Sequence, residues 1–117
     1  MNETFDFGAG PVPAHRHENG RGWVADTASV ADTAYVGPNA RVEDRAIVCG
    51  KARVSGDAVV RGNAIVSDYA VVYENAFVGD RARVCGDAIV CDHAIVGGNA
   101  LVGGNATVEG SAAVLRR

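Results

Sequence analysis

The sequence lacks the features that send a chain into or across a membrane. No hydrophobic run approaches the ~18 residues that a membrane-spanning segment needs, and the amino-terminal residues include acidic Glu3 and Asp6 instead of a basic region. Cysteine is also scarce, with three residues in 117. We therefore expect a cytoplasmic protein.

An excess of positive charge is absent as well. The chain has 11 Lys and Arg residues against 14 Asp and Glu residues, which gives a net charge of −3. Binding to the phosphates of nucleic acid needs a positive field, so we expect no nucleic-acid partner. With 117 residues, 48% hydrophobic and 21% charged, the composition is that of one globular domain.

One feature dominates the chain, a six-residue unit that repeats from Trp23 to Arg117 without insertion or deletion. Its second place is always Val, and in every complete unit its sixth place is Ala. The units are WVADTA, SVADTA, YVGPNA, RVEDRA, IVCGKA, RVSGDA, VVRGNA, IVSDYA, VVYENA, FVGDRA, RVCGDA, IVCDHA, IVGGNA, LVGGNA, TVEGSA and the partial AVLRR. A fixed short period indicates one structural unit stacked on itself.

The period is incompatible with a helix and fits a short strand followed by a corner. On a helix that turns ~100° per residue, valines six apart would rotate by about 240° per unit and spread over all sides. On an extended chain, Ala and Val point to one side and places one and three to the other. Places four and five carry pairs such as GN, GD and DR, which are typical of tight turns.

Two closures of such strands are available, a flat antiparallel meander and a coil with three hexads per turn. Two-residue hairpins favour Asn-Gly or Asp-Gly, whereas the order here is mostly reversed. An open sheet of more than ~10 strands would also need a covering layer. A coil buries its own apolar side, so we predict about five triangular coils with Val and Ala inside.

The units resemble those of the hexapeptide-repeat superfamily, and VADTAS, VGPNAR and VGGNAL match its pattern. The resemblance implies an all-β fold, a single-stranded left-handed parallel β-helix, over 95 of 117 residues. The opening GWVADTASVADTAYVGPNARV is similar to uncharacterised bacterial and phage hexapeptide-repeat proteins. We therefore divide the chain into residues 1–22 and a β-helix of residues 23–117.

Residues 1–22 lie outside the repeat and are predicted to be a cap or an arm, with a disordered tail as the alternative. A solenoid's first coil leaves apolar core facing water, so we expect Phe5 and Phe7 to fold over that end. His15 and His17 flank Arg16 in this segment. Two imidazoles so close in sequence are the only candidate metal ligands.

The sides of the predicted prism differ in charge. Places one and three of every third hexad share a side, and the side that contains Ser29 carries Arg83 as its one charge. Aligned apolar residues make contiguous patches, and such patches usually mark an interface. We therefore predict self-association through this side, by Ile47, Cys49, Ile65, Ser67, Cys85 and Leu101.

The three cysteines are predicted to be free thiols. Cys49 and Cys85 lie two coils apart on one side, beyond the ~7 Å between Cα atoms that a disulfide allows, and Cys91 lies on another side. The run Cys91, Asp92, His93 has the composition of a nucleophile beside a base. The alternative is that His93 is an exposed turn residue.

Many hexapeptide-repeat relatives are trimeric acyltransferases with a histidine base and pockets between subunits, and others are zinc-dependent carbonic anhydrases with three histidine ligands. This chain has no loop that interrupts the coils, no following helix and one histidine in the repeat, His93. His93 is thus the only transferable catalytic candidate, and carbonic anhydrase activity is excluded.

We therefore predict a non-enzymatic, self-associating scaffold or binding module without a cofactor. The resemblance favours a homotrimer, with a dimer as the alternative. The alternative functions are an acyltransferase with a site between subunits and a protein that sequesters a small ligand.

Overall fold

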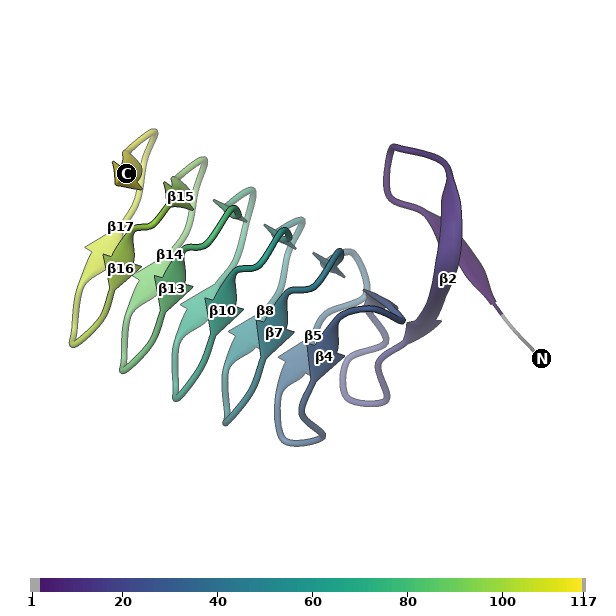
Figure 1. The fold of residues 1–117 in the computed structure, drawn as a ribbon. Coiled ribbons are helices and arrows are strands. Elements are labelled where there is room, and N and C mark those ends of the chain that lie inside the picture. Colours follow the sequence, from purple (N-terminus) through teal and green to yellow (C-terminus); the bar gives the residue numbers. More distant parts are fainter. Residues whose placement is uncertain (1–2, 117) are drawn as a thin grey trace.

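The computed structural model describes residues 3–116, which form a β-solenoid of about five coils (Figure 1). This part of the chain contains strands and no helix, and hence no helix that could cross a membrane. The all-β, coiled architecture predicted from the repeat is confirmed. Successive coils stack along one axis, and an amino-terminal hairpin lies at one end.

Three parallel stacks of short strands form the three faces of the solenoid. The first face contains β3 (Trp23–Ala25), β6 (Arg41–Val42), β9 (Val59–Val60), β12 (Phe77–Val78), β15 (Ile95–Gly98) and β18 (Ala113–Arg116). The second face contains β4 (Ser29–Val30), β7 (Ile47–Val48), β10 (Ile65–Val66), β13 (Arg83–Val84) and β16 (Leu101–Val102). The third face contains β5 (Tyr35–Val36), β8 (Arg53–Val54), β11 (Val71–Val72), β14 (Ile89–Val90) and β17 (Thr107–Val108).

The strand register repeats every 18 residues. Ile65 pairs with Ile47 on one side and with Arg83 on the other, so each residue stacks on the equivalent residue of the next coil. Backbone bonds follow the same rule, as when the Ile47 N–H donates to the Ala64 carbonyl over 2.9 Å. Three hexads per coil, as predicted, is therefore the observed geometry.

The core consists of the Val and Ala ladders. From Val36 to Val96 every second-place Val is fully buried, and the sixth-place Ala residues between them are buried as well. Stacking is what buries them, because Ala106 and Ala112, with no further described coil above them, are exposed. Within the described coils the interior is filled by Val and Ala side chains, and packing this close leaves little free space.

Many corners place their fourth residue in the left-handed region, and among the described hexads five of these residues are not glycine, Asp80 among them with φ of 59°. The carboxylate compensates for this conformation. Asp80 Oδ2 accepts the Gly98 N–H of the next coil over 2.8 Å, and Asp44, Asp68 and Asp92 accept equivalent glycine N–H groups. These aspartates therefore join neighbouring coils as well as turning the chain.

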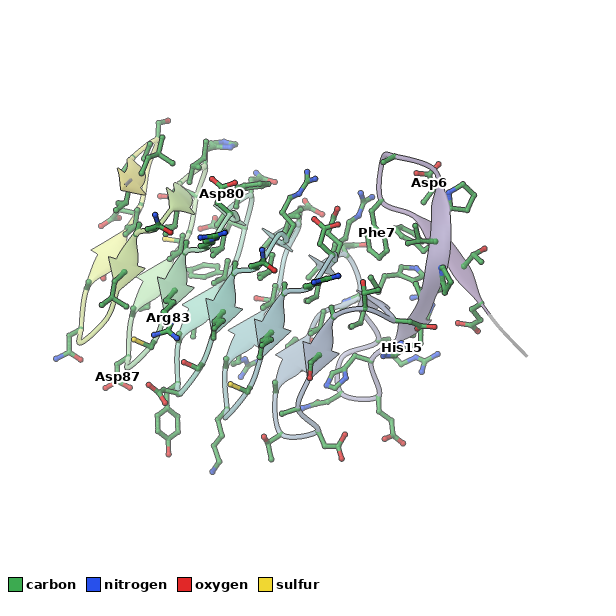
Figure 2. The ribbon with its side chains drawn as sticks, in the orientation of Figure 1. Asp6, Phe7, His15, Asp80, Arg83 and Asp87 are labelled. Atoms are coloured by element: carbon green, nitrogen blue, oxygen red, sulfur yellow. The ribbon has the colours of Figure 1, made fainter. Side chains whose placement is uncertain are left out.

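We expect Asp80→Ala to lower the free energy of unfolding by about 1–2 kcal/mol. Alanine keeps the steric cost of a positive φ and loses the bond to Gly98 (Figure 2 labels Asp80). Asp80→Gly, the matched control, loses the same bond but relieves the steric cost, so it should be closer to wild type. Urea denaturation measures the free energy of unfolding of both variants, and equal losses would contradict a steric cost of the positive φ at this position.

The amino-terminal hairpin extends the first face. β1 (Thr4–Asp6) pairs antiparallel with β2 (Pro11–Arg16), and β2 pairs antiparallel with β3. Phe5 stacks on Trp23 with 4.8 Å between ring centroids, and Phe7 meets Phe5 edge to face at 4.8 Å. The expectation that these two phenylalanines fold over the end of the core was wrong. They instead lie along the outside of the first face, because Trp23 occupies an outward place there.

The segment after β2 covers the end of the third face instead. The Gly22 N–H donates to the Val36 carbonyl, and the Val36 N–H donates to the Asn19 carbonyl. A Cβ at Gly22 would lie 2.3 Å from the Gly37 carbonyl oxygen, so only glycine permits this approach. On the second face, β4 is the terminal strand of its sheet and pairs only with β7 among the described strands.

Candidate functional site

The first places of the second face form a continuous column of outward side chains, and three of them belong to the predicted interface. Ser29, Ile47, Ile65, Arg83 and Leu101 are direct neighbours in the strand register. Ile47 is 38% exposed and Leu101 63% exposed, whereas Ile65 between them is half-buried. Arg83, labelled in Figure 2, is the one charged side chain of this column.

The flanking third places of the same face carry Cys49, Ser67 and Cys85, all half-buried. Cys49, Cys85 and Cys91 are free thiols, as predicted. The structure thus brings all six predicted interface residues onto one side of the solenoid. Apart from Arg83, the side chains of these places are aliphatic, thiol and hydroxyl groups.

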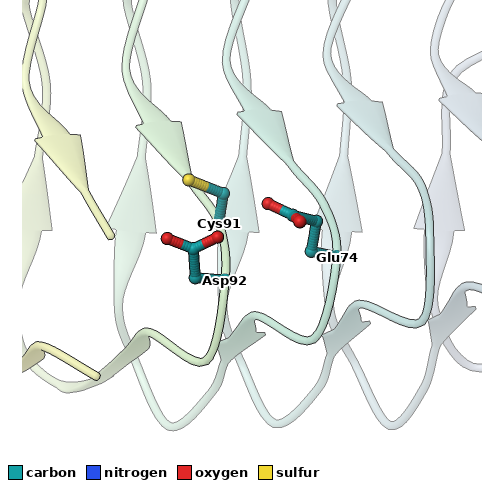
Figure 3. A group of neighbouring side chains, drawn as sticks. All are labelled: Glu74, Cys91 and Asp92. Carbon is teal, nitrogen blue, oxygen red and sulfur yellow. The ribbon is translucent and has the colours of Figure 1, made fainter. Parts of the chain in front are cut away.

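A second cluster joins Cys91 and Asp92 to Glu74 of the preceding coil (Figure 3). One donor atom from each of the three lies within 4.8 Å of the others. Burial raises the pKa of the Cys91 thiol, against a hydrogen bond with Tyr73 that lowers it, and the charges of Asp92 and Glu74 raise it further. The thiol is therefore kept protonated and is a poor nucleophile at neutral pH.

Thiolate and carboxylate are metal-ligand types, and within residues 3–116 these three residues form the group that could hold a metal ion. For two of the three residues, solvent exposure or a bond to the backbone explains the position of the side chain without a metal ion. Glu74 is exposed to solvent, and Asp92 Oδ2 accepts the Gly110 N–H over 2.9 Å, a bond that holds the pKa of Asp92 below its usual range. We therefore interpret this cluster as part of the corners that turn the chain between strands.

His93, the candidate catalytic base, is exposed at a corner of the third face. Its backbone N–H donates to the Gly110 carbonyl in the ordinary pattern of the solenoid. No side-chain hydrogen bond orients its imidazole within the described residues, although a general base needs such an orienting partner. The position is that of a turn residue, with Asn75 and Ser111 in the equivalent places of the neighbouring coils.

The candidate metal ligands His15 and His17 have separate partners. His15 Nδ1 lies 2.8 Å from Asp26 Oδ1 at the surface. His17 is buried, and its Nε2–H donates to the Ala34 carbonyl over 2.8 Å. That carbonyl also accepts from Asn19 over 3.1 Å. His17 thus provides a hydrogen bond to the backbone carbonyl that directly precedes β5, the first strand of the third face.

The repeat pattern did not reveal a cavity of about 290 Å³ between the hairpin and the first three coils. Phe7, Val12 and Pro13 of the hairpin form one wall, and Glu43 and Arg61 of the first face form another. The sequence contained one signal, since Glu43 and Arg61 are successive third places of the same column, between the small residues Ala25 and Gly79. The hairpin wall had no such signal, because residues 1–22 follow no period.

Comparison with known families matches a part of the repeat. A family model described as the YdcK beta solenoid repeat matches residues 52–68, about one coil. No curated protein and no solved structure matches the chain significantly. The family match and the stacked parallel strands agree with the resemblance drawn from the hexads.

Proposed function

We propose that this hexapeptide-repeat-like β-helix is a rigid scaffold that associates with further copies of itself through its second face. The observation that carries the proposal is the column of Ile47, Ile65 and Leu101, interrupted by the single charge of Arg83. Aliphatic side chains aligned along a face gain free energy when another surface removes them from water.

The other two faces are less suited to this role. The hairpin lies in the same sheet as the first face and covers Trp23, and that face also carries Arg41, Glu43 and Arg61. The third face has Arg53 over the Tyr35 ring and Glu109 near its end. A flat wall with one charge costs less to desolvate than a wall with two or three.

A trimer around a three-fold axis is the assembly we favour, since it would place three second faces against one another. Acyl transfer is the enzymatic alternative, and it would need a base held at a cavity between subunits. His93 lies at a corner of the third face and the thiol of Cys91 is kept protonated, so neither residue supports that alternative.

Replacing Ile47 with Glu should weaken self-association by at least about tenfold, or about 1.4 kcal/mol. The new carboxylate would have to be desolvated at the interface without a partner. Ile95→Glu is the matched control, because Ile95 has the same outward place on the first face and is 42% exposed, close to the 38% of Ile47. Sedimentation equilibrium across a concentration series measures the association constants.

Three outcomes would contradict the proposal. A wild-type mass that stays at the 12.0 kDa of one chain at all concentrations excludes self-association. Dissociation by Ile95→Glu but not by Ile47→Glu places the interface on the first face. An acetyl-CoA titration that gives saturable heat, lost in His93→Ala, supports the acyltransferase instead.

A further inference from the structure

The cavity between the hairpin and the first face contains a carboxylate without a hydrogen-bond donor. Only 9% of the Glu43 side chain is exposed. Among the described residues, no donor lies within hydrogen-bonding distance of its carboxylate, and its one ion-pair partner, Arg61 Nε, is 3.9 Å away. Glu43 lines the cavity and its oxygens are not sealed from solvent, so they are available to accept hydrogen bonds from a ligand that enters it.

Arg61 is a weak partner for Glu43. Its Nε lies closer to Asp44 Oδ2, at 3.6 Å, and its side chain is half-exposed. Burial raises the pKa of Glu43, and the charge of Arg61 only partly opposes this effect. The neighbouring charge of Asp44 raises the pKa further, the charge of Arg41 lowers it, and the pKa of Glu43 remains above its usual value.

The charges around the cavity favour a cation over an anion. Asp26, Glu43 and Asp44 line it together with a single Arg61. An anion drawn to Arg61 would approach the carboxylates of Glu43 and Asp44, which already face that guanidinium. A cation would meet the buried carboxylate directly, and the low polarity of the surroundings strengthens such an attraction.

The rest of the wall is apolar. Phe7, Val12 and Pro13 come from the hairpin, and Ala25 forms part of the floor. The volume of about 290 Å³ is just below the range for small-molecule pockets, roughly 300–1,000 Å³. It admits a single ring or a short branched chain that carries one charged group.

We propose that this cavity binds a small organic cation, a protonated amine on an apolar body, with Glu43 as the counter-ion. The ammonium donates hydrogen bonds to the Glu43 carboxylate, which lacks a donor, and the apolar body packs against Phe7, Val12 and Pro13. The site lies on the first face beside the hairpin, so it is separate from the second face and does not depend on self-association.

Three probes that share one ring test the charge preference: benzylamine, benzyl alcohol and benzoate. Each is titrated into ¹⁵N-labelled protein and followed by amide chemical shifts. Benzylamine should give saturable shifts at Gly10, Val12 and Glu43, with a dissociation constant at least about tenfold below that of benzyl alcohol. Benzoate should give no saturable shift at these residues.

Glu43→Gln tests the counter-ion. This substitution keeps the shape of the side chain and removes its charge, so it should lower the affinity for benzylamine to that for benzyl alcohol. Its melting temperature should equal or exceed that of wild type, because a desolvated carboxylate is gone. Glu109→Gln, at an exposed third place of the third face, is the matched control and should leave benzylamine binding unchanged.

The proposal is overturned if benzylamine shows no saturable binding, or binds no more tightly than benzyl alcohol. It is also overturned if the shifts lie away from the hairpin, or if Glu43→Gln keeps the preference for the amine. These results are independent of the oligomeric mass, so this inference and the proposed function can fail separately.

Discussion

Val66→Asp should unfold the protein, whereas Ile65→Asp should leave it folded. Val66 is fully buried in the middle of the prism, and Ile65, one residue earlier, points outward from the second face. An unpaired carboxylate in this interior costs several kcal/mol or more, out of a total stability of about 5–15 kcal/mol for a typical domain. Because each coil contacts only its neighbours, a coil broken at this position separates the two ends of the solenoid.

The control variant keeps the same chemistry on the other side of the strand. An aspartate at position 65 is solvated and lies directly beside Arg83 in the register, which is a favourable cross-strand pair. Circular dichroism with urea denaturation measures both variants. Native stability in Val66→Asp together with unfolding of Ile65→Asp would mean that Ile65, and not Val66, faces the interior.

Deleting six residues should disturb assembly more than deleting eighteen. Removal of residues 47–64 takes out one complete coil, so every later strand returns to its own face and the solenoid shortens by ~4.8 Å, one strand spacing. In that variant Ser29 becomes the neighbour of Ile65. We expect folding and self-association to persist, with the association weakened by the loss of Ile47.

Removal of residues 47–52 keeps every Val and Ala inward but moves all later strands by one face. Ile65, Arg83 and Leu101 then leave the second face and join the first face, the sheet to which the hairpin is paired. The solenoid should still form, because any hexad can stack on any other. Association should fall to a monomer or change its stoichiometry, which light scattering measures.

Both deletions are informative about the repeat itself. If the two variants assemble alike, the interface is confined to one end of the solenoid or to the hairpin. If both unfold, stacking of three hexads per coil does not tolerate new neighbours, contrary to the one-dimensional behaviour expected of a solenoid.

The repeat could be interpreted from sequence because each hexad has the same environment as the next. The position of Val66 follows from its place in the unit, and so does the outward direction of Ile47, Ile65 and Leu101. The thiols of Cys49 and Cys85 were likewise placed two coils apart by counting residues. None of these inferences needed the chain before Trp23.

The candidate site at the hairpin could not be predicted in this way. Phe5 was expected over the end of the core and instead stacks on Trp23, because the partner of a segment outside the repeat is set by tertiary contacts. Glu43 and Arg61 occupy equivalent places, yet one is buried and the other exposed. The cavity wall formed by Phe7, Val12 and Pro13 accounts for part of this difference.

The sequence by itself determined the solenoid, its three hexads per coil, its Val and Ala interior and the composition of each face. A strict period determines these features because every coil repeats the contacts of the one before it. Only the tertiary structure decided where the hairpin packs, which carboxylate it buries, and that corner residues such as Asp80 bond to the next coil. These contacts join segments that share no period, so they depend on how the finished surfaces meet.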